Sequence, residues 1–133
     1  MTMKMMRRMQ YNEVTFRNNT TRFIYKKCTP ETKAVNTRKD AGKVRQEGPD
    51  EIMASMPVKE IVSFMEDYPI EASTDAGTYV CNDVFYSALY ELAESDTVVS
   101  FTHVPYIEDD VKPVLALETA LETVLQYIRR TIG

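Results

Sequence analysis

One cysteine and one histidine in the C-terminal half of the chain have the residue types of a nucleophile and a general base. Cys81 follows the turn D-A-G-T-Y-V, and the apolar residues after it have helical spacing, so we expect it at the start of a helix. Such an end presents unpaired N–H groups and a partial positive charge, which stabilise a thiolate. His103, the only histidine in the 133 residues, can take the thiol proton.

The same two residues have a plain structural interpretation. A cysteine near the start of a core helix is often a small buried hydrophobic residue. A histidine at the end of a strand is often only a hydrogen-bonded polar group. Spacing alone therefore leaves a Cys–His pair and simple packing both open.

The elements that must position these residues alternate along the chain. Apolar periodicity predicts helices that begin after Pro57, at Cys81 and at about Pro113. Short extended segments are expected at Ile70–Thr74 and, as a buried strand, at Thr97–Val104. The last helix carries a set of large apolar residues on one face, namely Leu117, Leu121, Val124, Leu125 and Ile128. This alternation predicts an α/β fold with a largely parallel sheet.

The topology of such a fold brings Cys81 and His103 together. Cys81 follows one expected strand and its turn, and His103 lies at the carboxyl end of the next strand. Ligands of α/β sheets bind outside the carboxyl ends of the strands. We therefore expect both residues at one edge of the sheet.

The N-terminal third of the chain has a weaker pattern. Residues 12–25 contain β-branched and aromatic residues that favour one or two strands, whereas residues 26–46 are polar and predict a long loop. Residues 1–10 are Met-rich and basic, and we expect them to be poorly ordered. The length of 133 residues is that of a single domain, 1–133.

Composition restricts the class of protein. Residues 1–46 carry a net charge of +9 and residues 47–133 a net charge of −13, but the basic residues form no nucleic-acid motif, so we expect no nucleic-acid partner. No apolar run reaches eighteen residues, and no membrane partner is expected. Two cysteines 53 positions apart predict neither a zinc site nor a disulfide framework. A reducing, cytoplasmic setting fits best.

Several words of the sequence, in order, resemble type I pyroglutamyl peptidases (pyrrolidone-carboxylate peptidases). A-G-T-Y-V-C-N is similar to the family's A-G-x-[FY]-x-C-N word, and F-T-H-V-P to its F-x-H-[VI]-P word. E-G-P-D-E-I-M-A-S-M-P is similar to its G-P segment before a helix, and K-P-V-L-A-L-E to the segment that opens its final helix. The resemblance covers about residues 47–133.

The resemblance implies a cysteine peptidase that removes an N-terminal pyroglutamyl residue from peptides without metal or cofactor. It implies a three-layer αβα fold of the phosphorylase/hydrolase-like type, with family members often forming homo-oligomers. Cys81 would be the nucleophile and His103 the base. Tyr79 and Val80 match family positions that line the pocket for the lactam ring, although both residues could also simply pack the turn.

The family's third catalytic residue is a glutamate in an E-[RK]-x-x-x-N word, followed by an arginine. E-V-T-F-R-N predicts Glu13 for this role, with Asn18 at the family spacing and Arg22 as a substrate-binding residue. The word beyond it, T-R-F-I-Y-K-K, departs from the family pattern.

No segment matches the family's N-terminal strand and its G-F-x-P-F-G word, so the family fold is expected to lack its N-terminal part here. The alternative to an active peptidase is therefore a catalytically impaired fragment or pseudoenzyme of the same family. An unrelated α/β binding module with a basic arm is a further alternative, against which the ordered family words argue.

Overall fold

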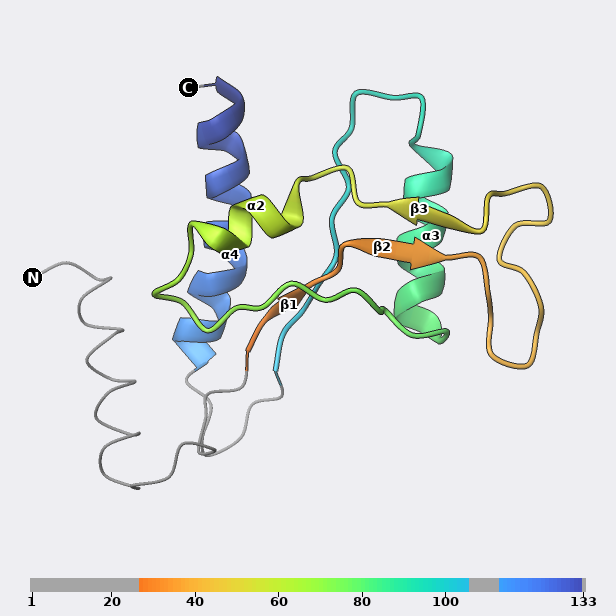
Figure 1. Cartoon of the computed structure of the whole chain (residues 1–133), viewed down its shortest axis with the longest axis horizontal. Coiled ribbons are helices and arrows are strands. Elements are labelled where there is room, and N and C mark those ends of the chain that lie inside the picture. The colour runs from red at the N-terminus through yellow and green to blue at the C-terminus, as the bar shows by residue number, and fades with distance from the viewer. Residues whose placement is uncertain (1–26, 106–112, 133) are drawn as a thin grey trace, which may run out of the picture. The chain divides into compact units, whose positions relative to one another are not determined.

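A computed structural model describes residues 27–105 and 113–132 (Figure 1). The residues expected to be poorly ordered, 1–10, and the strands expected in 12–25 lie outside the described residues. The chain divides into two compact units. We call residues 29–60 and 72–103 the strand unit, and residues 27–28, 61–71, 104–105 and 113–132 the helical unit.

The strand unit contains two short antiparallel ladders. β1 (Thr29–Pro30) pairs with β4 (Thr102–His103), with Thr29 opposite His103. β2 (Lys33–Val35) pairs with β3 (Glu51–Met53), with Ala34 opposite Ile52. Parallel pairing in this unit, within the described residues, is an isolated bridge between Glu31 and Ser73. The described ladders are thus antiparallel, whereas the alternation of elements predicts a largely parallel sheet.

Helix α3 (Val80–Glu91) covers the β2–β3 ladder, as Figure 1 shows. The Asp83 carboxylate lies in the first turn of α3, where it interacts favourably with the positive end of the helix dipole. The Asp83 N–H donates to the Tyr79 carbonyl at 3.0 Å. Phe85, Tyr86 and Leu89 point into a core that they share with Ala34 and Val44. The helix predicted from Cys81 is therefore confirmed, and its apolar face is the buried one.

The loop between β2 and β3 contacts Tyr86 on α3. The Tyr86 hydroxyl donates to the Pro49 carbonyl at 2.6 Å. A Cβ at Gly48 would overlap that hydroxyl, so glycine is required at this close approach. The core of the strand unit is thus sealed by a backbone segment as well as by side chains.

Two sequence predictions for this unit are corrected. Residues 26–46 are predicted to be a loop, but they include β1 and β2, and Ala34 is fully buried. Residues 97–104 are predicted to be one buried strand, but only Thr102–His103 pair as a strand and Thr97 and Val98 are exposed. In both places a short strand is stabilised by long-range pairing, which local composition does not reveal.

The helical unit contains α4 (Pro113–Ile132), which begins where the sequence predicts. Its buried residues are Leu115, Ala116, Thr119 and Thr123. The Cys28 thiol donates to the Ala116 carbonyl at 3.4 Å, and Cys28 forms a parallel bridge with Ile70. Helix α2 (Val58–Ser63), which follows Pro57, confirms the first predicted helix.

Among the described helices, none combines the length and apolar character that a membrane crossing requires.

Candidate active site

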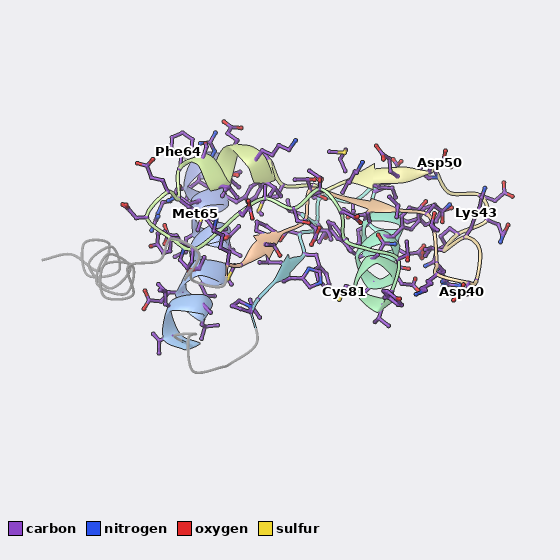
Figure 2. All side chains as sticks on the ribbon, turned by 60° about the horizontal axis from the view of Figure 1, so that its bottom comes forward. Asp40, Lys43, Asp50, Phe64, Met65 and Cys81 are labelled. Atoms are coloured by element: carbon purple, nitrogen blue, oxygen red, sulfur yellow. The ribbon has the colours of Figure 1, made fainter. Side chains whose placement is uncertain are left out.

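Cys81 is the second residue of α3, and the turn before it directs the chain into the helix. Figure 2 shows Cys81 at the beginning of this helix. Gly77 has a φ of +79°, a left-handed conformation that glycine adopts without strain, and its N–H donates to the Asp75 carboxylate at 2.8 Å. The residue before the helix, Tyr79, is extended. The Cys81 side chain is half-buried, so a substrate can reach it.

The start of α3 is attached to β2 by one buried side chain. Asn82 is fully buried, and its side-chain amide accepts from the Val35 N–H at 2.9 Å and donates to the Val35 carbonyl at 2.8 Å. The amide thus bonds to β2 as the peptide group of a neighbouring strand would. Because Asn82 adjoins Cys81, these bonds fix the backbone that carries the thiol.

The first amide groups of α3 are candidate donors to a developing oxyanion. The N–H of Asp83 makes the first bond of the helix, to the Tyr79 carbonyl. The N–H groups of Val80, Cys81 and Asn82 precede that bond, and a helix leaves such groups without an intrahelical partner. Donors of this kind stabilise the tetrahedral intermediate of acyl transfer.

His103 lies on β4 against a buried carboxylate. Its Nδ1 is 2.9 Å from Glu31 Oε2, and the Glu31 side chain is only 3% exposed whereas that of His103 is 40% exposed. An ionised carboxylate can only accept hydrogen bonds, so the contact favours the tautomer with the proton on Nδ1. The Nε2 of a neutral ring is then the free acceptor that a general base requires.

Aromatic contacts connect α3, the helix that carries Cys81, with the segment that carries His103. The rings of Phe85 and Phe101 are 5.8 Å apart, and that of His103 is 5.1 Å from Phe101. Cys81 lies one helical turn before Phe85 on the same face, as His103 lies two strand residues after Phe101 on the same face. The chain leaves α3 at its far end and runs back toward its beginning (Figure 1).

The remaining expected site residues have different positions. Tyr79 and Val80 are exposed, and the Lys39 ammonium group contacts the Tyr79 hydroxyl at 2.5 Å. Glu13 and Arg22 lie outside the described residues. Glu31 is the carboxylate beside His103 in the part of the chain that the structure describes.

Sequence reasoning missed Glu31 although the signal was present. E-T-K-A-V-N, Glu31 to Asn36, has the same spacing from glutamate to asparagine as E-V-T-F-R-N, Glu13 to Asn18. Neither word has the basic second residue of the family pattern, and Arg38 follows the second word as Arg22 follows the first. The two words could be separated only by the pairing of β1 with β4, which brings Glu31 to His103.

A cavity of about 360 Å³ lies elsewhere in the strand unit, between β3 and the start of α2. It is lined by Thr32, Met53, Ala54, Met56, Pro57, Val58, Lys59 and Glu60. Neither Cys81 nor His103 lines it. Within residues 27–105 and 113–132, no group of three or more His, Cys, Asp or Glu side chains could hold a metal ion.

Comparison with known proteins identifies the family to which the site is similar. The family model described as pyroglutamyl peptidase matches residues 26–132, a range that includes Glu31, Cys81 and His103 and excludes Glu13 and Arg22.

Individual relatives agree with this match. A pyrrolidone-carboxylate peptidase from Brevibacillus brevis is 36% identical over an alignment of 99 residues, and the match covers 68% of this chain and 46% of that protein. One from Thermococcus onnurineus is 36% identical over an alignment of 92 residues, and the match covers 63% of this chain and 46% of that protein. The chain therefore spans about half the length of the curated relatives it matches.

Solved structures have the same fold. The pyroglutamyl peptidase I from Bacillus amyloliquefaciens matches with a TM-score of 0.65 at 22% identity, over 90% of this chain and 71% of that one. The pyrrolidone carboxyl peptidase from Thermus thermophilus matches with a TM-score of 0.63 at 28% identity, over 75% of this chain and 62% of that one. The described residues therefore belong to an α/β fold.

Proposed function

Because the chain belongs to the pyroglutamyl peptidase family, we propose that it is a cysteine omega-peptidase that removes an N-terminal pyroglutamyl residue from peptides. The observation that carries the proposal is the contact between His103 and the buried Glu31, in the same unit as a half-buried cysteine at a helix start. A histidine that is only a surface polar group does not need a buried carboxylate. Burial of Glu31 is costly unless its charge is paired.

In the proposed reaction His103 Nε2 takes the proton of the Cys81 thiol, and the sulfur attacks the carbonyl carbon of the pyroglutamyl residue. The amide groups at the start of α3 donate to the oxyanion. His103 then returns the proton to the leaving amine nitrogen, and the C–N bond breaks to leave a thioester. A water molecule, which gives its proton to His103, cleaves the thioester, and pyroglutamate leaves as the thiol is restored. No metal or cofactor enters these steps.

We propose Glu31 as the third member of the catalytic set, in preference to Glu13. Its carboxylate holds the Nδ1 proton of His103 and stabilises the imidazolium that forms during the reaction, a role known from the Ser-His-Asp triad. Tyr79 and Val80 remain proposed walls of the lactam pocket, and Arg22 a proposed substrate-binding residue. The exposure of Tyr79 and Val80 leaves them accessible to a ligand.

We also propose the overall fold, the cellular location and the oligomeric state of the protein. The three-layer αβα arrangement with a largely parallel sheet, in one domain, is supported by the likeness to the solved peptidases and by the parallel bridge of Glu31 with Ser73. A cytoplasmic location is supported by two free cysteines, Cys28 and Cys81. Association into a homo-oligomer is supported by the exposed apolar residues of α4.

Turnover of a fluorogenic pyroglutamyl amide tests the proposal. We expect Cys81→Ala and His103→Ala to lower kcat/KM by about 1,000-fold or more and Glu31→Gln by at least about 100-fold. Glu13→Gln and Cys28→Ala are the matched controls, and each should stay within about twofold of the parent. Absence of turnover in the folded parent chain would establish the impaired fragment instead, and loss of turnover in Glu13→Gln alone would restore Glu13 to the site.

A further inference from the structure

Ser73 donates a hydrogen bond to the oxygen of Glu31 that His103 does not use. Ser73 Oγ lies 2.5 Å from Glu31 Oε1, while Glu31 Oε2 is the oxygen 2.9 Å from His103 Nδ1. The carboxylate is thus held from both sides by different donors. A buried carboxylate with one oxygen unpaired would incur a large desolvation cost, which the serine hydroxyl offsets.

The backbone around Ser73 makes its hydroxyl a fixed donor. The Ser73 N–H donates to the Pro30 carbonyl at 2.9 Å, and the Ser73 carbonyl accepts from the Thr32 N–H at 2.8 Å and from its hydroxyl at 2.9 Å. These bonds form the parallel bridge that sets Ser73 beside Glu31. Since the last torsion of a glutamate side chain is soft, an oriented carboxylate needs such a partner.

The same hydroxyl touches the turn that leads to the nucleophile. Ser73 Oγ is 3.3 Å from the Asp75 N–H and 3.2 Å from the Asp75 carbonyl, and the Asp75 carboxylate accepts from Gly77. Ser73 therefore contacts both the carboxylate behind the base and the turn before α3. No other described side chain has a hydrogen bond to both Glu31 and this turn.

We propose that Ser73 is a positioning residue of the site. Its hydroxyl holds the Glu31 carboxylate in the orientation that keeps the proton of His103 on Nδ1 and leaves Nε2 as the base. Ser73 acts through Glu31 and touches no reacting atom. The kinetic part of this inference rests on the proposed peptidase function, whereas the effect on the His103 tautomer does not.

The tautomer can be measured directly because His103 is the only histidine in the chain. In ¹⁵N-labelled full-length protein at neutral pH, the imidazole nitrogen shifts should give the Nδ1–H tautomer for the parent. We expect Ser73→Ala to move both shifts toward the averaged values of mixed tautomers, and Ser73→Thr, which keeps the hydroxyl, to restore them. Thr32→Val is the matched control, since it removes the hydroxyl bond to the Ser73 carbonyl but no contact with Glu31.

Kinetics with the fluorogenic amide supply the second readout. Ser73→Ala should lower kcat by about tenfold or more with KM unchanged, and Ser73→Thr should recover most of the loss. Should Ser73→Ala fail to fold by circular dichroism, Ser73→Cys, a weaker donor of similar size, takes its place in both measurements.

Unchanged imidazole shifts in a folded Ser73→Ala protein would overturn the positioning role. So would an equal change in Thr32→Val, because the effect would then come from the bridge and not from the hydroxyl. An inactive parent whose shifts still respond to Ser73→Ala would refute the peptidase function and retain the role of Ser73. The two failures are therefore distinguishable.

Discussion

Helices α3 and α4 are both amphipathic in sequence, yet they bury opposite kinds of surface. α3 buries Phe85, Tyr86 and Leu89, the large residues of its apolar face. α4 buries Leu115 and Ala116 together with two threonines, and leaves most of its large apolar residues exposed. The exposed set is Val114, Leu117, Leu121, Val124, Leu125, Ile128 and Ile132.

The buried threonines of α4 satisfy their own hydroxyl groups. Thr119 donates to the Leu115 carbonyl at 2.7 Å, and Thr123 donates to the Thr119 carbonyl at 3.1 Å. These bonds back to the preceding turn let a polar side chain be buried at little cost. The buried side of α4 thus carries its smaller side chains, and Met65 and Cys28 pack against that side.

The difference between α3 and α4 shows that a helical hydrophobic period identifies a helix but does not tell which of its faces packs against the rest of the protein. In the strand unit the partner of α3 is the β2–β3 ladder, and the large face meets it. In the described part of the helical unit no element covers the large face of α4. A contiguous exposed apolar surface of this kind marks an association surface or an aggregation risk.

The largest test of this contrast is truncation of one large residue on each helix. Phe85→Ala should lower the free energy of unfolding by about 3–5 kcal/mol, because it leaves a cavity in a closed core. Leu121→Ala, on the exposed face of α4, should change it by about 0.5 kcal/mol or less. Urea denaturation gives both values, and equal losses would mean that the α4 face is covered in solution.

A second test uses the two cysteines, one beside each helix. Burial raises the pKa of the Cys28 thiol from the ordinary 9.0 to about 11. A thiol whose pKa is raised on folding contributes stability below its unfolded value, and this contribution is lost as the pH rises from about 9 to about 11. We expect the free energy of unfolding to fall by about 2–3 kcal/mol across that window, because a tenfold change in a protonation equilibrium corresponds to about 1.4 kcal/mol.

Urea midpoints from pH 8 to pH 11 measure this loss. Cys28→Ala should lack the part that belongs to the thiol, so its curve should fall less steeply than that of the parent. Cys81→Ala leaves Cys28 and its burial in place, so it should keep the loss between pH 9 and pH 11 that belongs to the buried thiol. Parallel curves for Cys28→Ala and the parent would contradict the closed environment of Cys28.

The smallest expected effect on stability comes from polar substitution on the exposed face of α4. Leu117→Gln and Leu121→Gln together should change the free energy of unfolding by less than about 1 kcal/mol, since neither side chain leaves a core. Light scattering should show less self-association than in the parent, because the apolar surface is interrupted. Val84→Gln, at an exposed position of α3, is the control and should leave association unchanged.

Sequence patterns predicted the helices because helical periodicity is a local property. The starts of α3 and α4, and the placement of Cys81 at a helix start, are confirmed. The strands were harder to predict because β1 and β4 are two residues each and exist through pairing across more than seventy positions. The polar composition of residues 26–46 masks their burial.

The candidate site was predictable only in part for the same reason. The cysteine and the histidine each lie in a recognisable local motif. The carboxylate is marked only by a spacing from glutamate to asparagine, and this spacing occurs twice, at Glu13 and at Glu31. Ser73 and Asn82 act through hydrogen bonds over more than forty positions, to Glu31 and Val35. A buried polar residue in an apolar helix turn was the signal for Asn82, and a serine before a glycine turn is too common to single out Ser73.

The hydrogen bond between Asn82 and Val35 also allows the attachment of the helix start that carries Cys81 to be measured. The Val35 N–H is closed off by a side chain of α3 and not by a neighbouring strand. It can exchange its hydrogen for deuterium only when the start of α3 moves away from β2. The exchange rate of this one amide therefore reports how often the helix end that carries Cys81 opens. A ligand that holds this end in place lowers that rate.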